Sequence, residues 1–425
     1  MNAFQAEPLL RSSQARDEAW RCLQCFDAPC AAACPAGIPI PRFIRMIASG
    51  NVRGAAEVVR TANPLAHSCG VACPGEELCS AACVRARIDH PIEIRRLHRY
   101  ATECEAAAGP RTPPAPRASG PKVAIVGAGP SGLACASELR RAGARVTIFE
   151  ARDRVGGVLS STIPLYRFPD AVAKRDAEWS LGDAAPRFDS PVRDVETLAK
   201  RFDAVYLAMG LVSAMPTLEG THLAGVDDAG EFLARCRRSR YRNRAGRHVV
   251  VIGGGNVAID AAMAAVRCTG DARVHLLYRR TRAEMPAWDR EVREAEACGV
   301  MLHLLVSPIA FLGRRGRLTG VRLQQMRLGP PDADGRPRPV PVPGGEVEMP
   351  CDQAILATGL WLDPTPLGTL PITHTGRIRA HRKTGRVRGN IFAGGDAAGT
   401  DQTIVSAAGD GKRAARAILS YLSKG

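Results

Sequence analysis

The sequence has no long apolar segment. A membrane-spanning helix needs about 18 or more consecutive apolar residues, and no such run occurs in the 425 residues. Residues 1–20 lack the apolar core of a secretory signal peptide. We therefore expect a cytoplasmic protein with no membrane contact, in which thiols stay reduced. Clustered cysteines in such a protein bind metal more often than they form disulfides.

Lysine is scarce: it supplies 6 of the 58 basic residues, so the net charge of +16 rests on arginine. A basic surface can bind nucleic acid or an acidic partner. No helix-turn-helix, zinc-finger or RNA-binding motif accompanies the charge, which argues against nucleic acid. Docking of an acidic protein partner fits better, because charges at the rim of an interface steer association. The alternative is an arginine-rich composition without a binding role.

Cysteine, in contrast, is concentrated near the N-terminus. Eight of the fourteen cysteines form two sets, Cys22-x2-Cys25-x4-Cys30-x3-Cys34-Pro and Cys69-x3-Cys73-Pro-x4-Cys79-x3-Cys83. A close set followed by Cys-Pro is typical of bacterial ferredoxins, in which the fourth cysteine ligates the other cluster. The pattern predicts two [4Fe-4S] clusters. Structural zinc is the main alternative, but only the first pair has the usual two-residue spacing.

The remaining cysteines are scattered, and we expect each to be an ordinary small buried residue rather than a ligand. They are Cys104, Cys135, Cys236, Cys268, Cys298 and Cys351.

A first dinucleotide-binding signature follows a short apolar strand at 122–127 and opens a helix predicted over 130–142. It reads Gly127-Ala-Gly129-Pro130-Ser131-Gly132. The glycines allow a tight turn, close approach to a pyrophosphate and close packing of helix on strand. The phosphates then lie at the positive N-terminus of the helix. The second strand ends at Glu150, whose carboxylate can accept hydrogen bonds from ribose hydroxyls. We expect FAD here, because one FAD site formed from two sequence blocks with an NAD(P) domain inserted between them explains the order of the motifs.

A second signature, Gly253-Gly254-Gly255-Asn256, again lies between a strand and a helix. Its second strand ends in Arg279-Arg280, and alignment of the two strands places Arg279 where Glu150 stands in the first site. A guanidinium can pair with a 2′-phosphate that a carboxylate would repel. The pattern favours NADP(H) over NAD(H). The alternative is that the arginines contact solvent or phosphates without discriminating.

A third signature lies near the C-terminus, where Gly394-Gly395-Asp396 follows the strand 390–393. The Asp396 carboxylate can accept hydrogen bonds from flavin-nucleotide hydroxyls. We expect the turn ending at Gly359 and the helix that starts at Thr403 to approach the cofactor as well.

These motifs predict an α/β protein with two Rossmann-like dinucleotide-binding domains, one for FAD and one for NAD(P), preceded by an α-helical iron–sulfur domain. The expected boundaries are an iron–sulfur domain at 1–105, a Pro-rich linker at 106–120, the first FAD part at 121–225, the NAD(P) domain at 226–350 and the second FAD part at 351–425.

The chain resembles the small (beta) subunit of bacterial glutamate synthase and the N-terminal flavoprotein part of dihydropyrimidine dehydrogenase. The resemblance is carried by RCLQCFDAPCAAAC, NPLAHSCGVACPGEELCSAAC, VAIVGAGPSGLACA, VVVIGGGNVAIDAA, YRRTRAEMP and FAGGDAAGTDQTIVSAAGDGK. It implies a glutathione-reductase-like pair of domains. It also adds Gly157 and Gln402 to the cofactor-binding residues. The segment 178–189 departs from the family pattern, because its strand signal is poor.

The resemblance also implies how the ligands are shared between the clusters. Cys22, Cys25, Cys30 and Cys83 would hold one cluster. Cys34, Cys73 and Cys79 would hold the other, whose fourth ligand in dihydropyrimidine dehydrogenase is a glutamine. His98 stands at that position here, and Cys69 is the alternative.

We therefore expect an electron-transfer flavoprotein subunit that moves electrons between NAD(P)(H), FAD and two [4Fe-4S] clusters, to or from a separate oxidoreductase subunit with further redox centres. That partner would be of the glutamate synthase, dihydropyrimidine dehydrogenase or tungsten aldehyde oxidoreductase type. No pterin, FMN-barrel or amidotransferase motif is present, and we name no acid–base residue, because cofactors would supply the chemistry. The alternatives are a stand-alone NAD(P)H:acceptor diaphorase and a non-catalytic scaffold.

Overall fold

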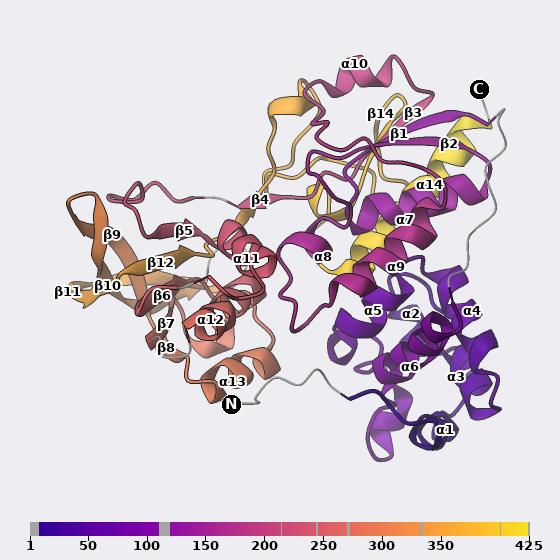
Figure 1. Ribbon diagram of the computed structural model, residues 1–425, viewed down its shortest axis with the longest axis horizontal. Coiled ribbons are helices and arrows are strands. Elements are labelled where there is room, and N and C mark those ends of the chain that lie inside the picture. Colours follow the sequence, from indigo (N-terminus) through magenta and orange to yellow (C-terminus); the bar gives the residue numbers. More distant parts are fainter. Residues whose placement is uncertain are drawn as a thin grey trace. The chain divides into compact units, whose positions relative to one another are not determined.

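The computed structural model describes residues 8–109, 120–213, 215–243, 245–269, 273–331, 335–399 and 401–423. Contacts divide the chain into two compact units (Figure 1). The smaller unit contains Ser161–Leu165 and Val212–Trp361, and the larger unit contains most of the rest. The short helix α8 (Val158–Ser161) lies where the chain passes from one to the other.

The N-terminal part of the larger unit is helical. Its elements are α1 (Ser12–Trp20), α2 (Pro29–Ala32), α3 (Ile40–Ala48), α4 (Val52–Ala62), α5 (Ala66–Ala72) and α6 (Ile94–Ala107), with the 3₁₀ turns η1 (Gly75–Glu77) and η2 (Val84–Arg87). In α3 the apolar side chains recur at helical spacing, so Phe43, Ile44 and Ile47 are all buried in one core. Asn51 caps α4 by accepting a hydrogen bond from Gly54 N at 2.9 Å.

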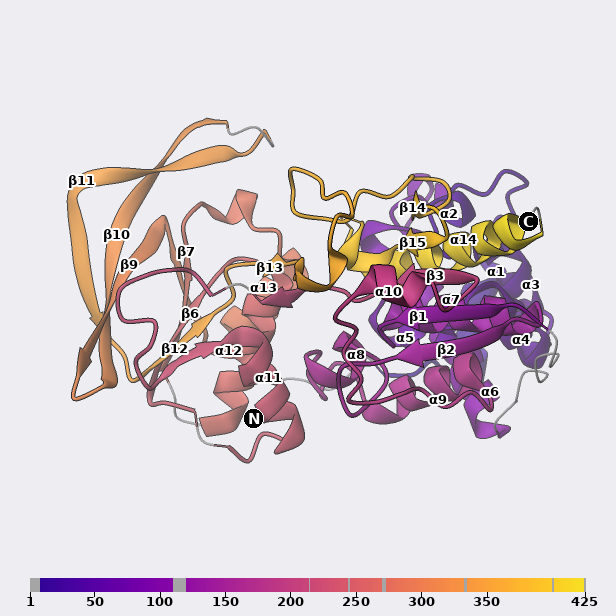
Figure 2. The same ribbon diagram turned by 90° about the horizontal axis from the view of Figure 1, so that it is seen from above.

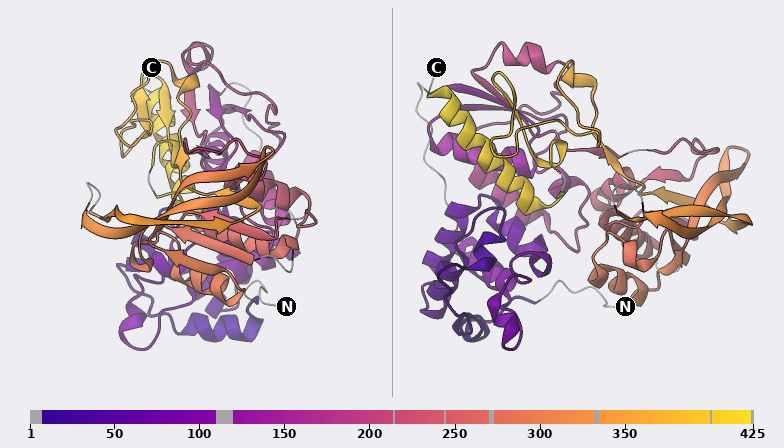
Figure 3. Two further views of the ribbon diagram at one scale, coloured as in Figure 1. Left: turned by 90° about the vertical axis from the view of Figure 1, so that its left-hand side faces the viewer. Right: turned by 180° about the vertical axis from the view of Figure 1, so that it is seen from behind.

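The rest of the larger unit is a five-stranded sheet with the order β14-β15-β3-β1-β2, parallel except for the β14–β15 pair (Figure 2). The strands are β1 (Lys122–Val126), β2 (Arg145–Phe149), β3 (Ala204–Leu207), β14 (Arg386–Arg388) and β15 (Ile391–Ala393). The helical elements are α7 (Pro130–Arg141), α9 (Asp170–Leu181), α10 (Val195–Ala199), α14 (Ile404–Leu422), η4 (Thr365–Leu367) and η5 (Gly395–Ala397). Helix α14, yellow in Figure 3, runs beside α7.

The smaller unit has a parallel sheet with the order β5-β12-β6-β7-β8. Its elements are β5 (Val226–Asp228), β6 (His248–Ile252), β7 (Arg273–Tyr278), β8 (Met301–Leu304), β12 (Gln353–Leu356), α11 (Ala229–Arg238), α12 (Asn256–Thr269), α13 (Asp289–Ala297) and η3 (Arg282–Glu284). A long antiparallel sheet of β9 (Val306–Arg314), β10 (Arg317–Pro331) and β11 (Pro337–Pro350) is added, and β4 (Val212–Ser213) pairs with β13 (Leu360–Trp361).

The α/β class and both strand–turn–helix–strand units expected from the sequence are present. One assignment differs: the strand β12, which sequence analysis placed in the second FAD part, pairs with β5 and β6 of the smaller unit. The segment with a poor strand signal, 178–189, contains the end of α9 and forms only a single bridge, from Arg187 to Phe149. Most of the Pro-rich linker lies outside the described residues.

Among the helices in the described part of the chain, none combines the length and apolar character needed to cross a bilayer.

Candidate functional site

The eight N-terminal cysteines gather in two groups. In the first group, burial and the neighbouring thiols of Cys83, Cys22 and Cys25 together raise the pKa of Cys30 to about 11. Burial likewise raises the pKa of Cys22, with Cys83 and Cys25 as its neighbours. The fold therefore brings Cys83 to the first three cysteines, as the resemblance implies.

The second group contains Cys34, Cys73 and Cys79. Burial, together with the neighbouring thiols of Cys34 and of Cys30 from the first group, raises the pKa of Cys79 to about 12. Burial also raises the pKa of Cys73, whose neighbouring thiols are Cys69, Cys79 and Cys34. Cys69, which lies on α5, is thus within electrostatic range of this group as well.

The donor set fits iron–sulfur clusters. All eight cysteines are free rather than paired in disulfides. Crowded thiols raise one another's pKa values, and a cationic cluster reverses this by stabilising the thiolates. Within the described residues no three His, Cys, Asp or Glu side chains could hold a single metal ion.

His98, the predicted fourth ligand of the second cluster, lies on α6 with 6 % of its surface exposed. Burial lowers its pKa to about 3, so the imidazole is neutral, and its ring is hydrogen-bonded to the backbone of Ala66. Its Nε2 atom is buried without a hydrogen-bond partner. Metal-binding histidines commonly form a hydrogen bond through one ring nitrogen and bind the metal through the other. The neutral imidazole of His98 meets the first condition and has Nε2 available for the second. The groups that act most on its charge are His67, Arg60 and Asp176, and the thiols of Cys34, Cys73 and Cys79 are not among them.

A buried ionic network connects the cysteine-bearing helices to the α/β part of the same unit. Asp176 of α9 accepts hydrogen bonds from Arg60 Nη1 at 2.5 Å and from the backbone N atoms of His67 and Ser68 at 3.2 and 2.7 Å. The latter two donors lie in the first turn of α5, the helix that carries Cys69 and ends at Cys73. The Asp176 carboxylate therefore holds the start of a cluster-binding helix.

A second buried contact joins the same parts. The ammonium group of Lys412 on α14 donates hydrogen bonds to the carbonyl oxygens of Ala36 and Ala62. Neither contact is foreseeable from sequence, because each joins residues more than 100 positions apart.

The first glycine signature forms the turn that a dinucleotide requires. Gly127 has a φ of +101°, and a Cβ there would lie 2.4 Å from the carbonyl oxygen of Ala208. A Cβ on Gly132 would lie 2.0 Å from the carbonyl oxygen of Gly127. Larger residues are thus excluded at both positions. Pro130 begins α7, and the Ser131 hydroxyl lies 2.6 Å from that of Tyr206.

Glu150 lies beside this turn because the parallel register pairs Val126 with Phe149. Its two carboxylate oxygens accept hydrogen bonds from the backbone N atoms of Ala128 and Arg152, at 2.8 and 2.9 Å. Only 7 % of its surface is exposed. The carboxylate is therefore fixed next to the predicted ribose position.

The C-terminal signature reaches the same turn. A Cβ on Gly395, whose φ is +62°, would lie 2.8 Å from Ser131 Cβ. Burial raises the pKa of Asp396. Asp410 of α14, which the sequence reasoning missed, accepts a hydrogen bond from Gly395 N at 3.0 Å.

The other predicted FAD contacts are divided between the two units. Gly157 comes close to Gly129: a Cβ on Gly157 would lie 3.0 Å from Gly129 Cα. Thr403 caps α14 by accepting a hydrogen bond from Ser406 N, and Gln402 precedes it with a φ of +41°. Gly359, in contrast, belongs to the smaller unit.

The second glycine signature lies in the smaller unit. Gly253 has a φ of +148°, and a Cβ there would lie 2.4 Å from the carbonyl oxygen of Ala357. The turn before Gly359 therefore supports the NAD(P) signature. Gly255 leads into α12, whose first residue, Asn256, accepts a hydrogen bond from Trp288 N at 3.0 Å.

The strand register corrects one alignment. Ile252 pairs with Leu277, so Tyr278 rather than Arg279 occupies the position equivalent to Glu150. Arg279 follows one residue later and is exposed. Arg280 is 4 % exposed, and its Nε donates to the carbonyl oxygen of Pro337 at 2.7 Å. The two adjacent arginines thus differ: Arg279 is open to a ligand, whereas Arg280 joins β7 to β11.

The comparisons with known proteins agree with this geometry. Residues 2–109 match the family model for dihydropyrimidine dehydrogenase domain II with its 4Fe-4S cluster. Residues 93–166 and 121–411 match the pyridine nucleotide-disulphide oxidoreductase model.

The chain belongs to the pyridine nucleotide-disulphide oxidoreductase family.

The glutamate synthase [NADPH] small chain of Halomonas elongata is 32 % identical over 97 % of this chain and 92 % of its own length. The NADP(+)-dependent formate dehydrogenase subunit beta of Moorella thermoacetica is 38 % identical over 94 % of this chain and 60 % of its own length. This chain thus spans only part of some of its relatives. FprA of Mycobacterium tuberculosis, solved with NADPH, matches with a TM-score of 0.59 and 21 % identity over 72 % of this chain and 85 % of its own, which shows the shared fold.

The resemblance, the fold class and the cofactor classes predicted from the sequence are confirmed. The protein is an oxidoreductase with a 4Fe-4S domain and FAD- and NAD(P)-binding domains.

Proposed function

We propose that this chain is the electron-transfer flavoprotein subunit of a larger oxidoreductase. It passes electrons between NAD(P)(H) and a separate subunit with further redox centres. The Gly127–Gly132 turn and Glu150 would hold FAD, which when bound would supply the conversion between two-electron and one-electron transfer. The Arg60–Asp176 contact carries the proposal, because it ties the cluster-binding helices to the FAD-binding sheet within one compact unit. Relatives named as subunits of glutamate synthase and formate dehydrogenase support a partner.

The residues supply position rather than acid–base chemistry. Glu150, Asp396 and the Gly127–Gly132 turn would hold FAD. The Gly253–Gly255 turn would hold the nicotinamide nucleotide, and Arg279 would select NADP(H) over NAD(H). Cys22, Cys25, Cys30 and Cys83 would hold one cluster. Cys34, Cys73, Cys79 and His98 would hold the other, with Cys69 as the alternative to His98. We place the protein in the cytoplasm, where its free cysteines stay reduced.

Anaerobic purification followed by metal and flavin analysis tests the cofactor content. We expect bound FAD and about eight irons per chain, as two [4Fe-4S] clusters require. Zinc in place of iron would contradict the proposal.

A cluster-ligand variant tests the relay. Cys25→Ser should lose the first cluster and with it the reduction of the co-purified partner, while NADPH oxidation by an artificial acceptor continues. Cys298→Ser, outside both cysteine groups, serves as the control. Full partner reduction by Cys25→Ser would show that electrons leave without that cluster.

A further inference from the structure

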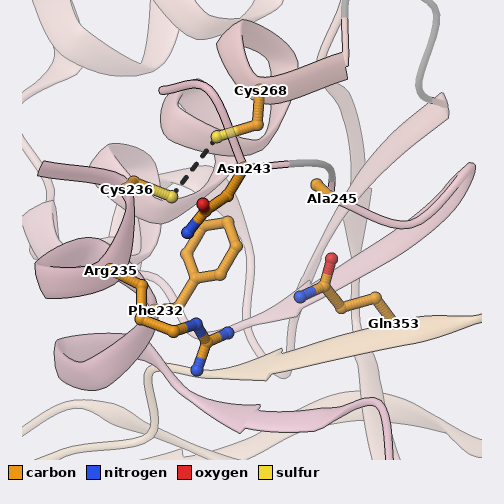
Figure 4. Close-up of a pocket in the computed structure, with 7 residues that line it drawn as sticks. All are labelled: Phe232, Arg235, Cys236, Asn243, Ala245, Cys268 and Gln353. Carbon is orange, nitrogen blue, oxygen red and sulfur yellow. Dashed lines mark hydrogen bonds between the residues drawn. The ribbon is translucent and has the colours of Figure 1, made fainter. Parts of the chain in front are cut away.

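Two cysteines outside the cluster groups lie together in the smaller unit. Cys236 on α11 and Cys268 on α12 have their sulfur atoms 3.3 Å apart (Figure 4). They are 32 positions apart in sequence, so the packing of α11 on α12 brings them together. Sequence analysis had treated both as ordinary buried residues.

The pair lines a cavity of about 270 Å³. The other lining residues are Phe232, Arg235, Asn243, Ala245 and Gln353 (Figure 4). Cys236 is 1 % exposed, whereas Cys268 is half-buried. A small molecule therefore reaches the Cys268 sulfur more readily than the Cys236 sulfur.

The two thiols are electronically different. The hydrogen bond between them lowers the pKa of Cys268 and raises that of Cys236, which burial raises further. Together with the greater exposure of Cys268, this favours Cys268 as the thiol that attacks first, because the thiolate is the reactive form of cysteine. Cys236 keeps its proton and lies close enough to attack a sulfur bound to Cys268.

We propose that Cys236 and Cys268 form a reversible dithiol–disulfide site whose substrate is a low-molecular-weight disulfide. This site is independent of the cluster relay. The cavity volume limits the substrate to a small molecule. Asp227 already pairs with Arg235 at 2.8 Å and accepts a hydrogen bond from Gln353 at 2.6 Å, so these two lining residues do not select a charged substrate.

The exchange balances in two steps. The Cys268 thiolate attacks one sulfur of the disulfide RSSR, which breaks the S–S bond and releases RS⁻. Cys236 then attacks the Cys268 sulfur of the mixed disulfide, loses its proton and releases a second thiolate. Both protein thiols are thereby oxidised by two electrons, and RSSR is reduced to two thiols. A covalent bond of about 2.05 Å requires the sulfurs to approach by roughly 1 Å more.

Peptide mapping tests the pair. The full-length holoprotein is incubated anaerobically with glutathione disulfide, alkylated and digested for mass spectrometry. We expect a Cys236–Cys268 cross-link that dithiothreitol reverses, and the same cross-link in Cys298→Ser. Recovery of both cysteines as alkylated, unlinked peptides would overturn the proposal.

Single variants test the order of attack. Cys236→Ser should trap one glutathione on Cys268, whereas Cys268→Ser should react at Cys236 at least about tenfold more slowly, as expected for a buried thiol without thiolate character. Cys236→Ala provides a second variant if serine disturbs folding. Equal rates at the two cysteines would contradict the assigned roles. Hydroxyethyl disulfide is a second small probe, and a failure of both disulfides to react would refute the proposed substrate class.

Discussion

Asp176 on α9 and Arg60 on α4 form an ion pair in which the Asp176 side chain is 0 % exposed and the Arg60 side chain is 4 % exposed. Burial alone would raise the pKa of Asp176, but Arg60 and the donors from His67 and Ser68 outweigh it and lower the pKa to about 2. The carboxylate is therefore ionised at neutral pH. Its removal would leave the Arg60 charge buried beside Glu105 alone.

Asp176→Ala should destabilise the larger unit by about 3–5 kcal/mol, as expected when one partner of a buried ion pair is lost. It should also loosen α5, so cluster content should fall. Thermal unfolding and iron analysis of the anaerobic protein measure both effects. The matched control is Glu178→Ala on the same helix, which removes the 56 % exposed partner of the 77 % exposed Lys174 and should cost about 0–1 kcal/mol. Equal losses in the two variants would show that Asp176 is not a structural anchor.

Glu150→Ala should weaken FAD binding by about ten- to a hundredfold. Hydrogen bonds from Ala128 N and Arg152 N fix the carboxylate beside the predicted ribose position. The variant would lose the hydrogen bond from the ribose hydroxyls to this charged group, and such a bond contributes about 1.5–3 kcal/mol. Flavin content after dialysis and titration of the apoprotein measure the change. Asp153→Ala, on the exposed loop after Arg152, should retain FAD. Unchanged affinity in Glu150→Ala would place the ribose elsewhere.

Arg279→Glu should raise the KM for NADPH about ten- to a hundredfold and change that for NADH little, because a carboxylate repels the 2′-phosphate. Arg280→Gln is the control variant at the adjacent residue. It removes the buried contact with Pro337 and should lower thermal stability without altering the ratio of the KM values for NADPH and NADH. Steady-state kinetics with both coenzymes decide the matter. If both KM values rose equally in Arg279→Glu, the arginine would not be selecting the coenzyme.

His98→Ala and Cys69→Ser test the fourth ligand of the second cluster. His98 has a buried Nε2 without a partner, whereas Cys69 lies within range of Cys34 and Cys73. We expect His98→Ala to alter the EPR spectrum of one cluster and to leave FAD reduction by NADPH intact. Cys69→Ser should leave the spectrum unchanged. The opposite result would assign the ligand to Cys69.

The local elements of this protein could be predicted from its sequence. Glycine spacing determined the two dinucleotide turns, because only glycine fits a positive φ beside a close backbone, as at Gly127 and Gly253. Cysteine spacing likewise indicated two clusters, because the thiolate ligands of ferredoxin-type clusters come from closely spaced residues.

Tertiary structure alone decided the relations between distant segments. The strand pairing placed Tyr278 rather than Arg279 opposite the second glycine turn, and it moved β12 into the NAD(P)-binding sheet. Buried Asp176, Lys412 and the Cys236–Cys268 pair carry no local signal, because each depends on packing between elements far apart in the chain. Sequence periodicity reports which face of an element is buried, whereas the partner of that face is set by how the elements pack together.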